Sequence, residues 1–275
     1  MPRDLSVVRP RSACPACNRP IAAYDNIPVF SWLLLRGKCR HCKAAISPRY
    51  AAVELLTGAL FVLSYLTAGG PNEVAVKYCV LCFLLIGLVF TDAETQLLPD
   101  LLTKPGIALG LLFSLFVPVD GPAGSLFLQS GDWRVVSLIN SLAGALFGSA
   151  FILGVALLYK AVRGVEGMGQ GDVKLMALIG AFLGMKLTLI VLVLGSVIGS
   201  LFGVLLILVT FRKRLARRKS RYSEPARIAR KNAWSSAKLI FRRFPIPFGV
   251  FLGTAAVVAN FWGTPMVNWY MEFYR

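Results

Sequence analysis

Residues 187–211 read LTLIVLVLGSVIGSLFGVLLILVTF, a run without a single Asp, Glu, Lys or Arg. An α-helix that crosses a bilayer needs about 20 consecutive apolar residues, so this run predicts a transmembrane helix. Gly195, Gly199 and Gly203 recur at every fourth position and therefore share one helix face, where a second helix can approach closely. We interpret these glycines as packing positions rather than as parts of a site.

Further apolar runs lie on both sides of this segment. They predict an all-α fold, a polytopic transmembrane helix bundle of about seven spans, with the other spans at 50–69, 74–91, 101–119, 135–159, 172–184 and 246–263. The composition agrees, because 56% of the residues are hydrophobic and only 16% are charged, against about 25% charged in soluble proteins.

The net charge of +17 is concentrated in two blocks. Segment 211–243 holds thirteen Lys and Arg against one acid, and segment 1–50 holds nine against two. If 1–50 is cytoplasmic, the alternating spans place 92–100, 160–171 and 212–245 on the same side, as the positive-inside rule requires. Basic blocks beside apolar spans favour membrane lipid as the partner over nucleic acid, and we expect no nucleic-acid binding.

The N-terminal segment predicts a separate metal-binding module. Cys14 and Cys17 form one C-x-x-C pair, and Cys39 and Cys42 form a second pair 21 residues later. Two such turns can aim four thiolates at one zinc ion, and a four-thiolate shell is closed and therefore structural. Two disulfides are the alternative, which the reducing cytoplasm disfavours. We expect a zinc-ribbon-like cytoplasmic module over 1–49, followed by a transmembrane domain over 50–275 with a basic cytoplasmic loop at 212–245.

The remaining sulfur and imidazole groups suggest little chemistry. His41 is the one histidine of the chain, so a Ser-His-Asp triad would depend on it alone, and no H-E-x-x-H string occurs. We place His41 near the metal or on the surface, and we interpret Cys79 and Cys82 as buried apolar residues. Residues 1–12 are polar and basic without an apolar core, which predicts no cleavable signal peptide.

Two aspartates lie at predicted helix ends on the same side of the membrane. Asp92 ends the second span, and Asp172 opens the fifth after Gly169 and Gly171. Aspartyl proteolysis needs two carboxylates that share one proton, so that one takes a proton from water while the other polarises the scissile carbonyl. The two glycines leave the backbone bare, which would let an extended substrate approach.

Other readings of these acids stay open. An Asp at a helix start is often only an N-cap, which is the interpretation that we prefer for Asp100. Acids in a membrane also serve ion and proton paths, so a transporter or channel that uses Asp92 and Asp172 as relay groups is an alternative. A third possibility is a non-catalytic membrane scaffold with a zinc ribbon.

The combined motifs resemble the bacterial type IV prepilin leader peptidase/N-methyltransferase family, whose members are Gly-x-Gly-Asp aspartyl peptidases. The matching strings include both cysteine pairs and Gly169-Gln170-Gly171-Asp172-Val173-Lys174. They also include Asn26-Ile27-Pro28, Ser31-Trp32, Pro48-Arg49-Tyr50 followed by Val53-Glu54-Leu55, Asp92 followed by Leu98-Pro99-Asp100, and Pro245-Ile246-Pro247-Phe248-Gly249. Presenilin-like peptidases share the Gly-x-Gly-Asp string, but the cysteine pairs argue against that reading.

The resemblance implies an enzyme of the bacterial inner membrane with Asp92 and Asp172 as catalytic residues at the cytoplasmic face. It implies cleavage of the basic leader of type IV prepilins or type II secretion pseudopilins after a glycine. It also implies methylation of the new N-terminus with S-adenosylmethionine, for which we assign no binding residues. Gly169, Gly171, Lys174, Asp100 and Glu54 are expected to support the site, and Glu54, Glu94 and Glu166 are acids that could contact a basic leader.

The chain departs from the family pattern at its start. Family members usually carry an additional membrane span before the cysteine module, and no such span follows Met1 here. Either the start recorded here lies downstream of the true one, or the chain is a shortened variant. We expect the methyltransferase activity to be the more affected of the two, because the span adjoins the module.

Overall fold

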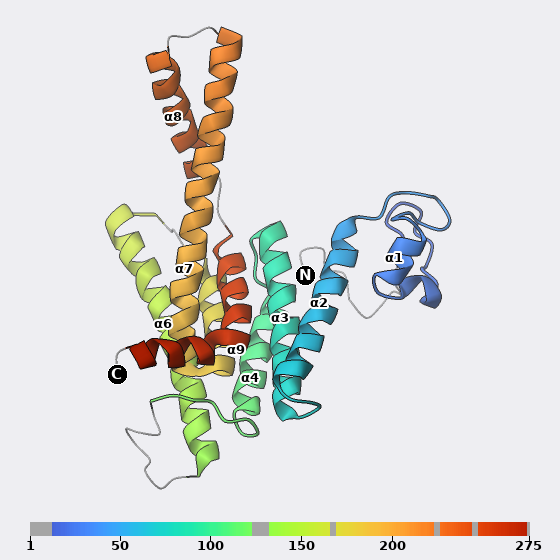
Figure 1. The fold of residues 1–275 in the computed structure, drawn as a ribbon, viewed down its shortest axis with the longest axis vertical. Helices are drawn as coiled ribbons and strands as arrows, with labels where there is room; N and C mark the ends of the chain where they lie inside the picture. Colours follow the sequence, from blue (N-terminus) through green and yellow to red (C-terminus); the bar gives the residue numbers. More distant parts are fainter. Residues whose placement is uncertain (1–12, 123–131, 166–168, 223–225, 244–246, 274–275) are drawn as a thin grey trace.

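The chain is described here by a computed structural model covering residues 13–122, 132–165, 169–222, 226–243 and 247–273. Within these ranges every regular element is a helix, and β-structure is limited to two isolated antiparallel bridges (Figure 1). The predicted all-α fold is therefore confirmed. The elements are η1 (Ala23–Asn26), α1 (Phe30–Leu34), α2 (Pro48–Thr67), α3 (Glu73–Thr95), α4 (Asp100–Phe113), α6 (Trp133–Arg163), α7 (Gln170–Tyr222), α8 (Ala226–Arg243) and α9 (Phe248–Phe273).

Five of the described helices are long and apolar enough to cross a membrane, namely α2, α3, α6, α7 and α9. The chain is therefore a multi-pass membrane protein. Helix α4 has 14 residues and is shorter than the predicted span at 101–119. Helix α9 continues to Phe273, past the predicted end at residue 263, and Figure 1 shows its C-terminal part turning across the bundle. Pro265 lies inside this helix, and proline is a common cause of such a bend.

Helix α7 contains two of the predicted spans. At Gly184 the backbone adopts φ 74° and ψ 175°, which is not helical and which only glycine adopts readily. Asp172, before this break, and Gly199, after it, both lie close to the first turn of α9. The chain therefore reverses direction at Gly184, and the break corresponds to the predicted turn between 172–184 and 187–211.

The core of the bundle forms where α7 packs between its neighbours. Its buried side chains come from α3, α6, α7 and α9 and include Leu81, Leu85, Leu175, Phe182 and Leu252. The backbones of α6 and α7 meet at Gly144 and Gly180. A Cβ on Gly180 would overlap the Gly144 carbonyl group, so a larger residue does not fit there without a shift of the backbone. Small residues give this close packing in the absence of a strong hydrophobic driving force between membrane helices.

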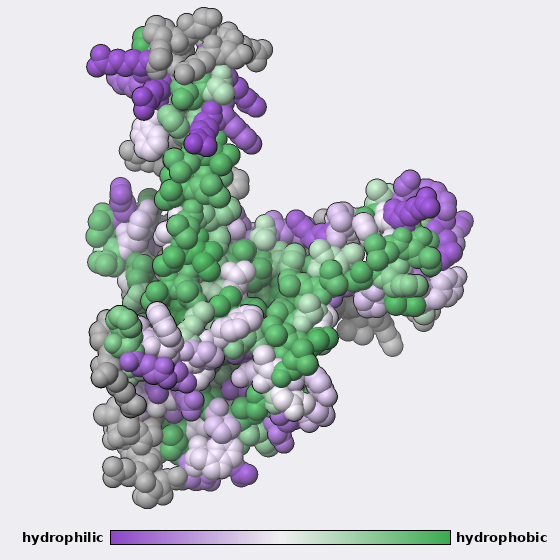
Figure 2. Space-filling model, viewed as in Figure 1, coloured by the Kyte–Doolittle hydropathy of each residue, from purple (hydrophilic) through white to green (hydrophobic). Residues whose placement is uncertain are grey.

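The basic segment at 212–245, expected as a cytoplasmic loop between two spans, is mostly helical. Helix α7 continues to Tyr222, and α8 returns beside it to form a hairpin that projects from the bundle (Figure 1). Figure 2 shows hydrophilic residues gathered at the far end of this hairpin. The rings of Phe211 in α7 and Trp234 in α8 pack edge to face with their centroids 5.7 Å apart, and this contact holds the two helices together. The helix persists because Lys and Arg are good helix formers and no Gly or Pro occurs between 204 and 224.

The close contact between α6 and α7 predicts a specific sensitivity to added volume. Gly180→Ala should lower the stability of the protein by roughly 1–3 kcal/mol, because its Cβ would overlap backbone atoms of Gly144 and Ala145. The matched control is Gly154→Ala on α6, where a Cβ would meet no atom within 4 Å. Thermal unfolding in detergent measures the difference, and equal midpoints for both variants would contradict this packing.

Candidate functional site: a carboxylate pair and a cysteine cluster

Asp92 lies in the last turn of α3 and is buried, with 5% of its surface exposed. The helix ends just beyond it because Gln96 adopts the left-handed conformation and its N–H donates to the Asp92 carbonyl at 2.9 Å. The Asp92 carboxylate accepts a hydrogen bond from the backbone N–H of Val250, with an N–Oδ2 distance of 3.0 Å. The first turn of α9 therefore fixes one carboxylate of the pair.

Asp172 lies in the first turn of α7 and is 9% exposed. Its backbone N–H donates to the carbonyl of Gly169 at 3.2 Å, which closes the turn that starts the helix. The Gly-x-Gly-Asp string thus forms a tight helix start that turns the Asp172 side chain into the bundle rather than toward water.

The two carboxylates meet at Gly249. A Cβ placed on Gly249 would lie 2.8 Å from Oδ2 of Asp92 and 3.3 Å from Oδ1 of Asp172. Both oxygens therefore border one small volume, which only a residue without a side chain leaves open. Folding brings together two acids that are 80 positions apart in the sequence, and like charges this close favour a shared proton.

The loop after Asp92 packs against the start of α7. A Cβ on Gly171 would lie 3.0 Å from Cβ of Leu98, so the absence of a side chain at this position lets the loop approach α7 closely. Gly169 is open, since the nearest atom to its Cβ position is 3.9 Å away. Asp100 is the first residue of α4 and not its N-cap, which is Pro99. Its carboxylate instead pairs with Lys174 of α7 and with Lys104 at 2.8 Å.

Two of the acids expected to contact a substrate leader have partners within the chain. The Glu54 carboxylate accepts the N–H of Val29 at 2.8 Å, and Glu94 forms an ion pair with Arg49 at 3.3 Å. These contacts tie the N-terminal module to α2, and α2 to the end of α3. Val29 has φ 60°, which is rare for a β-branched residue, and the Glu54 contact helps to hold it there. Glu166 lies outside the described residues.

The four cysteines of the N-terminal module form one cluster. The sulfur atoms of Cys14, Cys17, Cys39 and Cys42 all lie within 4.8 Å of one another. The two C-x-x-C turns have matching hydrogen bonds, since Cys14 N donates to Arg19 O at 3.0 Å and Cys39 N donates to Ala44 O at 2.9 Å. His41 is exposed at the rim of the cluster, as expected.

The cluster has the dimensions of a tetrahedral thiolate site. Sulfurs at 2.3 Å from a central zinc would be separated by roughly 3.8 Å, and Cys14 Sγ lies 3.7 Å from Cys42 Sγ. Hydrogen bonds from the backbone N–H groups of Cys17 and Ala16 lower the pKa of the Cys14 thiol to about 6. The thiolate form of Cys14, which binds metal, is therefore favoured, and the four clustered cysteines could hold one metal ion.

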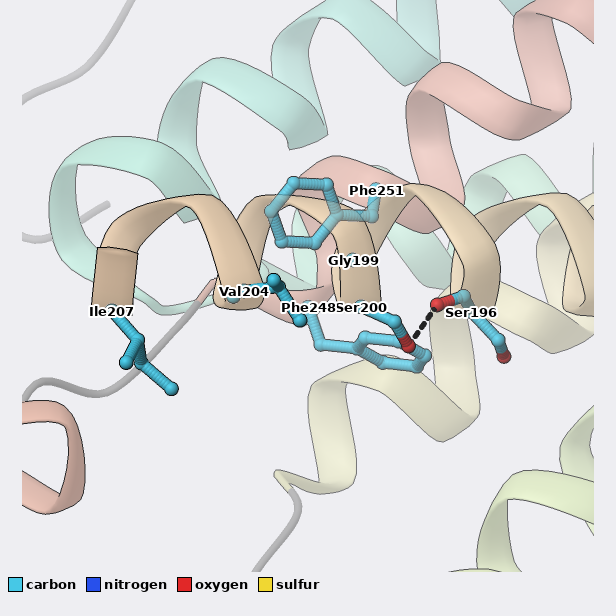
Figure 3. A pocket seen from close by; sticks show the side chains of 8 residues that line it. Ser196, Gly199, Ser200, Val204, Ile207, Phe248 and Phe251 are labelled. Carbon is cyan, nitrogen blue, oxygen red and sulfur yellow. Dashed lines mark hydrogen bonds between the residues drawn. The ribbon is translucent and has the colours of Figure 1, made fainter. Parts of the chain in front are cut away.

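A cavity of about 410 Å³ lies between α7 and α9 on the apolar surface of the bundle (Figure 3). It is lined by small and apolar side chains together with two serines, and the Ser200 hydroxyl donates to the Ser196 carbonyl at 2.7 Å. That hydroxyl is bonded within its own helix, and the lining of the cavity contains no Asp, Glu, His, Cys, Lys or Arg. The chemistry of the bundle is therefore concentrated at Gly249.

The sequence interpretation missed the contribution of α9. Gly249 and Val250 supply the gap and the hydrogen-bond donor that bring the acids together, yet no role was assigned to either residue. The signal was present in Pro245-Ile246-Pro247-Phe248-Gly249, where prolines precede a helix and a glycine follows directly. What the string lacks is any indication of which distant side chains its backbone would meet.

Comparisons with known proteins match both parts of the chain. The family model described as "Bacterial Peptidase A24 N-terminal domain" matches residues 1–68, which contain the cysteines. The model "Type IV leader peptidase family" matches residues 79–204, which contain both aspartates. No solved structure gives a significant match to the chain.

Several curated relatives are named "Prepilin leader peptidase/N-methyltransferase". The protein of Aeromonas salmonicida is 38% identical over 96% of this chain and 75% of its own length. The protein of Pseudomonas aeruginosa is 35% identical over 98% of this chain and 77% of its own length. The protein of Neisseria gonorrhoeae is 40% identical over 72% of this chain and 63% of its own length. The chain belongs to the type IV leader peptidase family.

Proposed function

We infer that this chain is a prepilin leader peptidase that also methylates the N-terminus released by cleavage. The names of its relatives state both activities. The observation that supports the peptidase chemistry most directly is the approach of Asp92 and Asp172 to one point beside Gly249. Two buried carboxylates in this arrangement can activate a water molecule against a peptide carbonyl without a nucleophilic side chain.

The site position fits a substrate whose leader stays in the cytoplasm. Asp92 at the C-terminal end of α3 lies beside Asp172 and Gly249 at the N-terminal ends of α7 and α9. The basic α7–α8 hairpin extends from the same end of the bundle (Figure 1). Because positively charged segments remain cytoplasmic, we place the site at the cytoplasmic face of the bacterial inner membrane. The substrates in this proposal are type IV prepilins or type II secretion pseudopilins, cut after a glycine.

We propose that the cysteine cluster holds a structural zinc ion. Four thiolates leave no open coordination position, so the metal would stabilise the module rather than take part in catalysis. The Val29–Glu54 hydrogen bond connects the module to α2, and the ion pair between Arg49 of α2 and Glu94 connects α2 to the end of α3, two residues from Asp92. A stable module would in this way support the position of α3.

Methylation needs a methyl donor, and the methyltransferase name of the relatives implies S-adenosylmethionine. A cavity of about 500 Å³ lies between the module and the start of α2, within the size range of small-molecule sites. Its walls carry acidic, basic and aromatic side chains, including Glu54, Lys38 and Trp32. These groups suit a ligand that has both charges and an adenine ring, and when bound the cofactor would supply the methyl group.

Substitution of either aspartate tests the proposed carboxylate pair. Asp92→Asn and Asp172→Asn should each lower cleavage of a prepilin-like peptide by at least about 100-fold, because each removes one partner of the acid–base pair. The peptide needs a basic leader, a glycine and an apolar helix, and the assay uses the whole chain in detergent. The matched control is Asp132→Asn, because Asp132 is the N-cap residue of α6 and lies away from the carboxylate pair. Retained cleavage in a folded Asn variant would remove that residue from the pair.

The second prediction concerns the gap at Gly249. Gly249→Ala should lower the cleavage rate by roughly 100-fold, because a Cβ there would lie 2.8 Å from Asp92 Oδ2 and push the carboxylates apart. Gly58→Ala is the control, since a Cβ on Gly58 meets no atom within 4 Å. Initial rates and thermal midpoints should be measured together. An active, equally stable Gly249→Ala variant would show that the gap is not needed.

The third prediction concerns the metal. Purified protein should contain about one zinc ion per chain, and Cys39→Ser should lose it because three thiolates no longer close the shell. Cys79→Ser is the matched control, because Cys79 lies in α3 outside the cluster. Elemental analysis by mass spectrometry gives the stoichiometry. Equal zinc content in both variants would contradict the assignment.

A further inference from the structure

The two carboxylates differ in their hydrogen bonding. Asp92 Oδ2 accepts the backbone N–H of Val250 at 3.0 Å. In the part of the chain that the structure describes, no hydrogen bond reaches the carboxylate of Asp172. The pair is therefore asymmetric before any substrate arrives.

This asymmetry comes from the position of α9. Gly249 and Val250 lie in its first turn, where backbone N–H groups have no acceptor within the helix. An N–H group can only donate, so it favours the ionised form of the carboxylate that accepts from it. Asp92 receives this stabilisation, and Asp172 does not.

The other charged groups near these helix ends compensate one another. On α3, Glu94 pairs with Arg49 of α2 at 3.3 Å. On α4, Asp100 pairs with Lys104 at 2.8 Å and with Lys174 of α7. Among the described residues, the direct hydrogen-bond donor that distinguishes the Asp92 carboxylate from that of Asp172 is the Val250 N–H of α9.

We propose that the first turn of α9 assigns the two aspartates different roles: Asp92 is the ionised base, and Asp172 carries the shared proton as the acid. This assignment rests on the proposed peptidase function and deepens it. Val250 acts here as a positioning residue, through its backbone N–H rather than its side chain. Gly249 completes the arrangement, because any larger residue would separate the acids.

The assignment gives a balanced reaction. Asp92 takes a proton from water while the water oxygen bonds to the scissile carbonyl carbon, and Asp172 gives its proton to the carbonyl oxygen. The tetrahedral intermediate then loses a proton from a hydroxyl group to Asp172 and reforms the carbonyl. The carbon–nitrogen bond breaks as Asp92 returns its proton to the leaving amine. Both aspartates end in their starting protonation states, as a catalyst requires.

A backbone substitution tests this role directly. Val250→Pro removes the N–H donor and keeps an apolar side chain, and proline is tolerated in the first turn of a helix. Loss of a hydrogen bond to a charged group should lower kcat by about 10- to 100-fold. KM should change less than about twofold, since Val250 stabilises the base rather than the substrate. Val250→Ala, which keeps the N–H, should retain kcat. Equal kcat values for a folded Val250→Pro and for Val250→Ala would overturn the proposal.

A binding measurement decides the question without turnover and also if Val250→Pro does not fold. The probe is a prepilin-like peptide whose scissile amide is replaced by a hydroxyethylene group. Its hydroxyl should donate to the ionised base, so Asp92→Asn should weaken binding about tenfold more than Asp172→Asn. The reverse order, or equal losses, would overturn the assignment. Wild-type protein that does not cleave the parent peptide would instead contradict the proposed peptidase function.

Discussion

The close approach of two carboxylates beside a glycine is the constraint on which the rest of this structure depends. Two acids that both ionise would repel strongly in a medium of low dielectric, so the fold must supply donors and hold the helices in place. The first turn of α9 supplies a donor, the backbone N–H of Val250. The bundle holds the helices in place, because three helix ends from distant parts of the sequence meet at Gly249.

Several contacts fix those helix ends relative to one another. Gly171 lets the loop after Asp92 lie on the start of α7, and Asp100 connects α4 to Lys174 two residues beyond Asp172. Deeper in the bundle, Gly144 and Gly180 bring α6 and α7 into backbone contact. Small residues thus serve two purposes here: in the core they permit close packing, and at the site they leave room for side-chain carboxylates.

Sequence reasoning recovered the parts of the molecule that have a local signature. Apolar length identified the spans, the C-x-x-C spacing identified the sulfur cluster, and acids at span ends identified Asp92 and Asp172 as a pair. It gave no indication that the basic segment would be helical, and residues 212–222 continue α7 despite their cations. The N-cap interpretation of Asp100 was wrong, because Pro99 is the N-cap of α4. The contacts of Asp100 with Lys174 and of Gly171 with Leu98 went unpredicted, and no periodicity could have revealed partners so distant in sequence.

The central claim is that Asp92 and Asp172 face one another in the folded protein. It is tested most directly by thiol cross-linking of the Asp92→Cys/Asp172→Cys double variant with Cys79 and Cys82 replaced by alanine. A short bifunctional thiol reagent should join α3 to α7, and mass spectrometry should find the linked peptides. The Asp92→Cys/Asp132→Cys variant should give no cross-link between the two cysteines, because these positions lie at opposite ends of the bundle. Absence of the 92–172 link in folded protein with both thiols reactive would contradict the account.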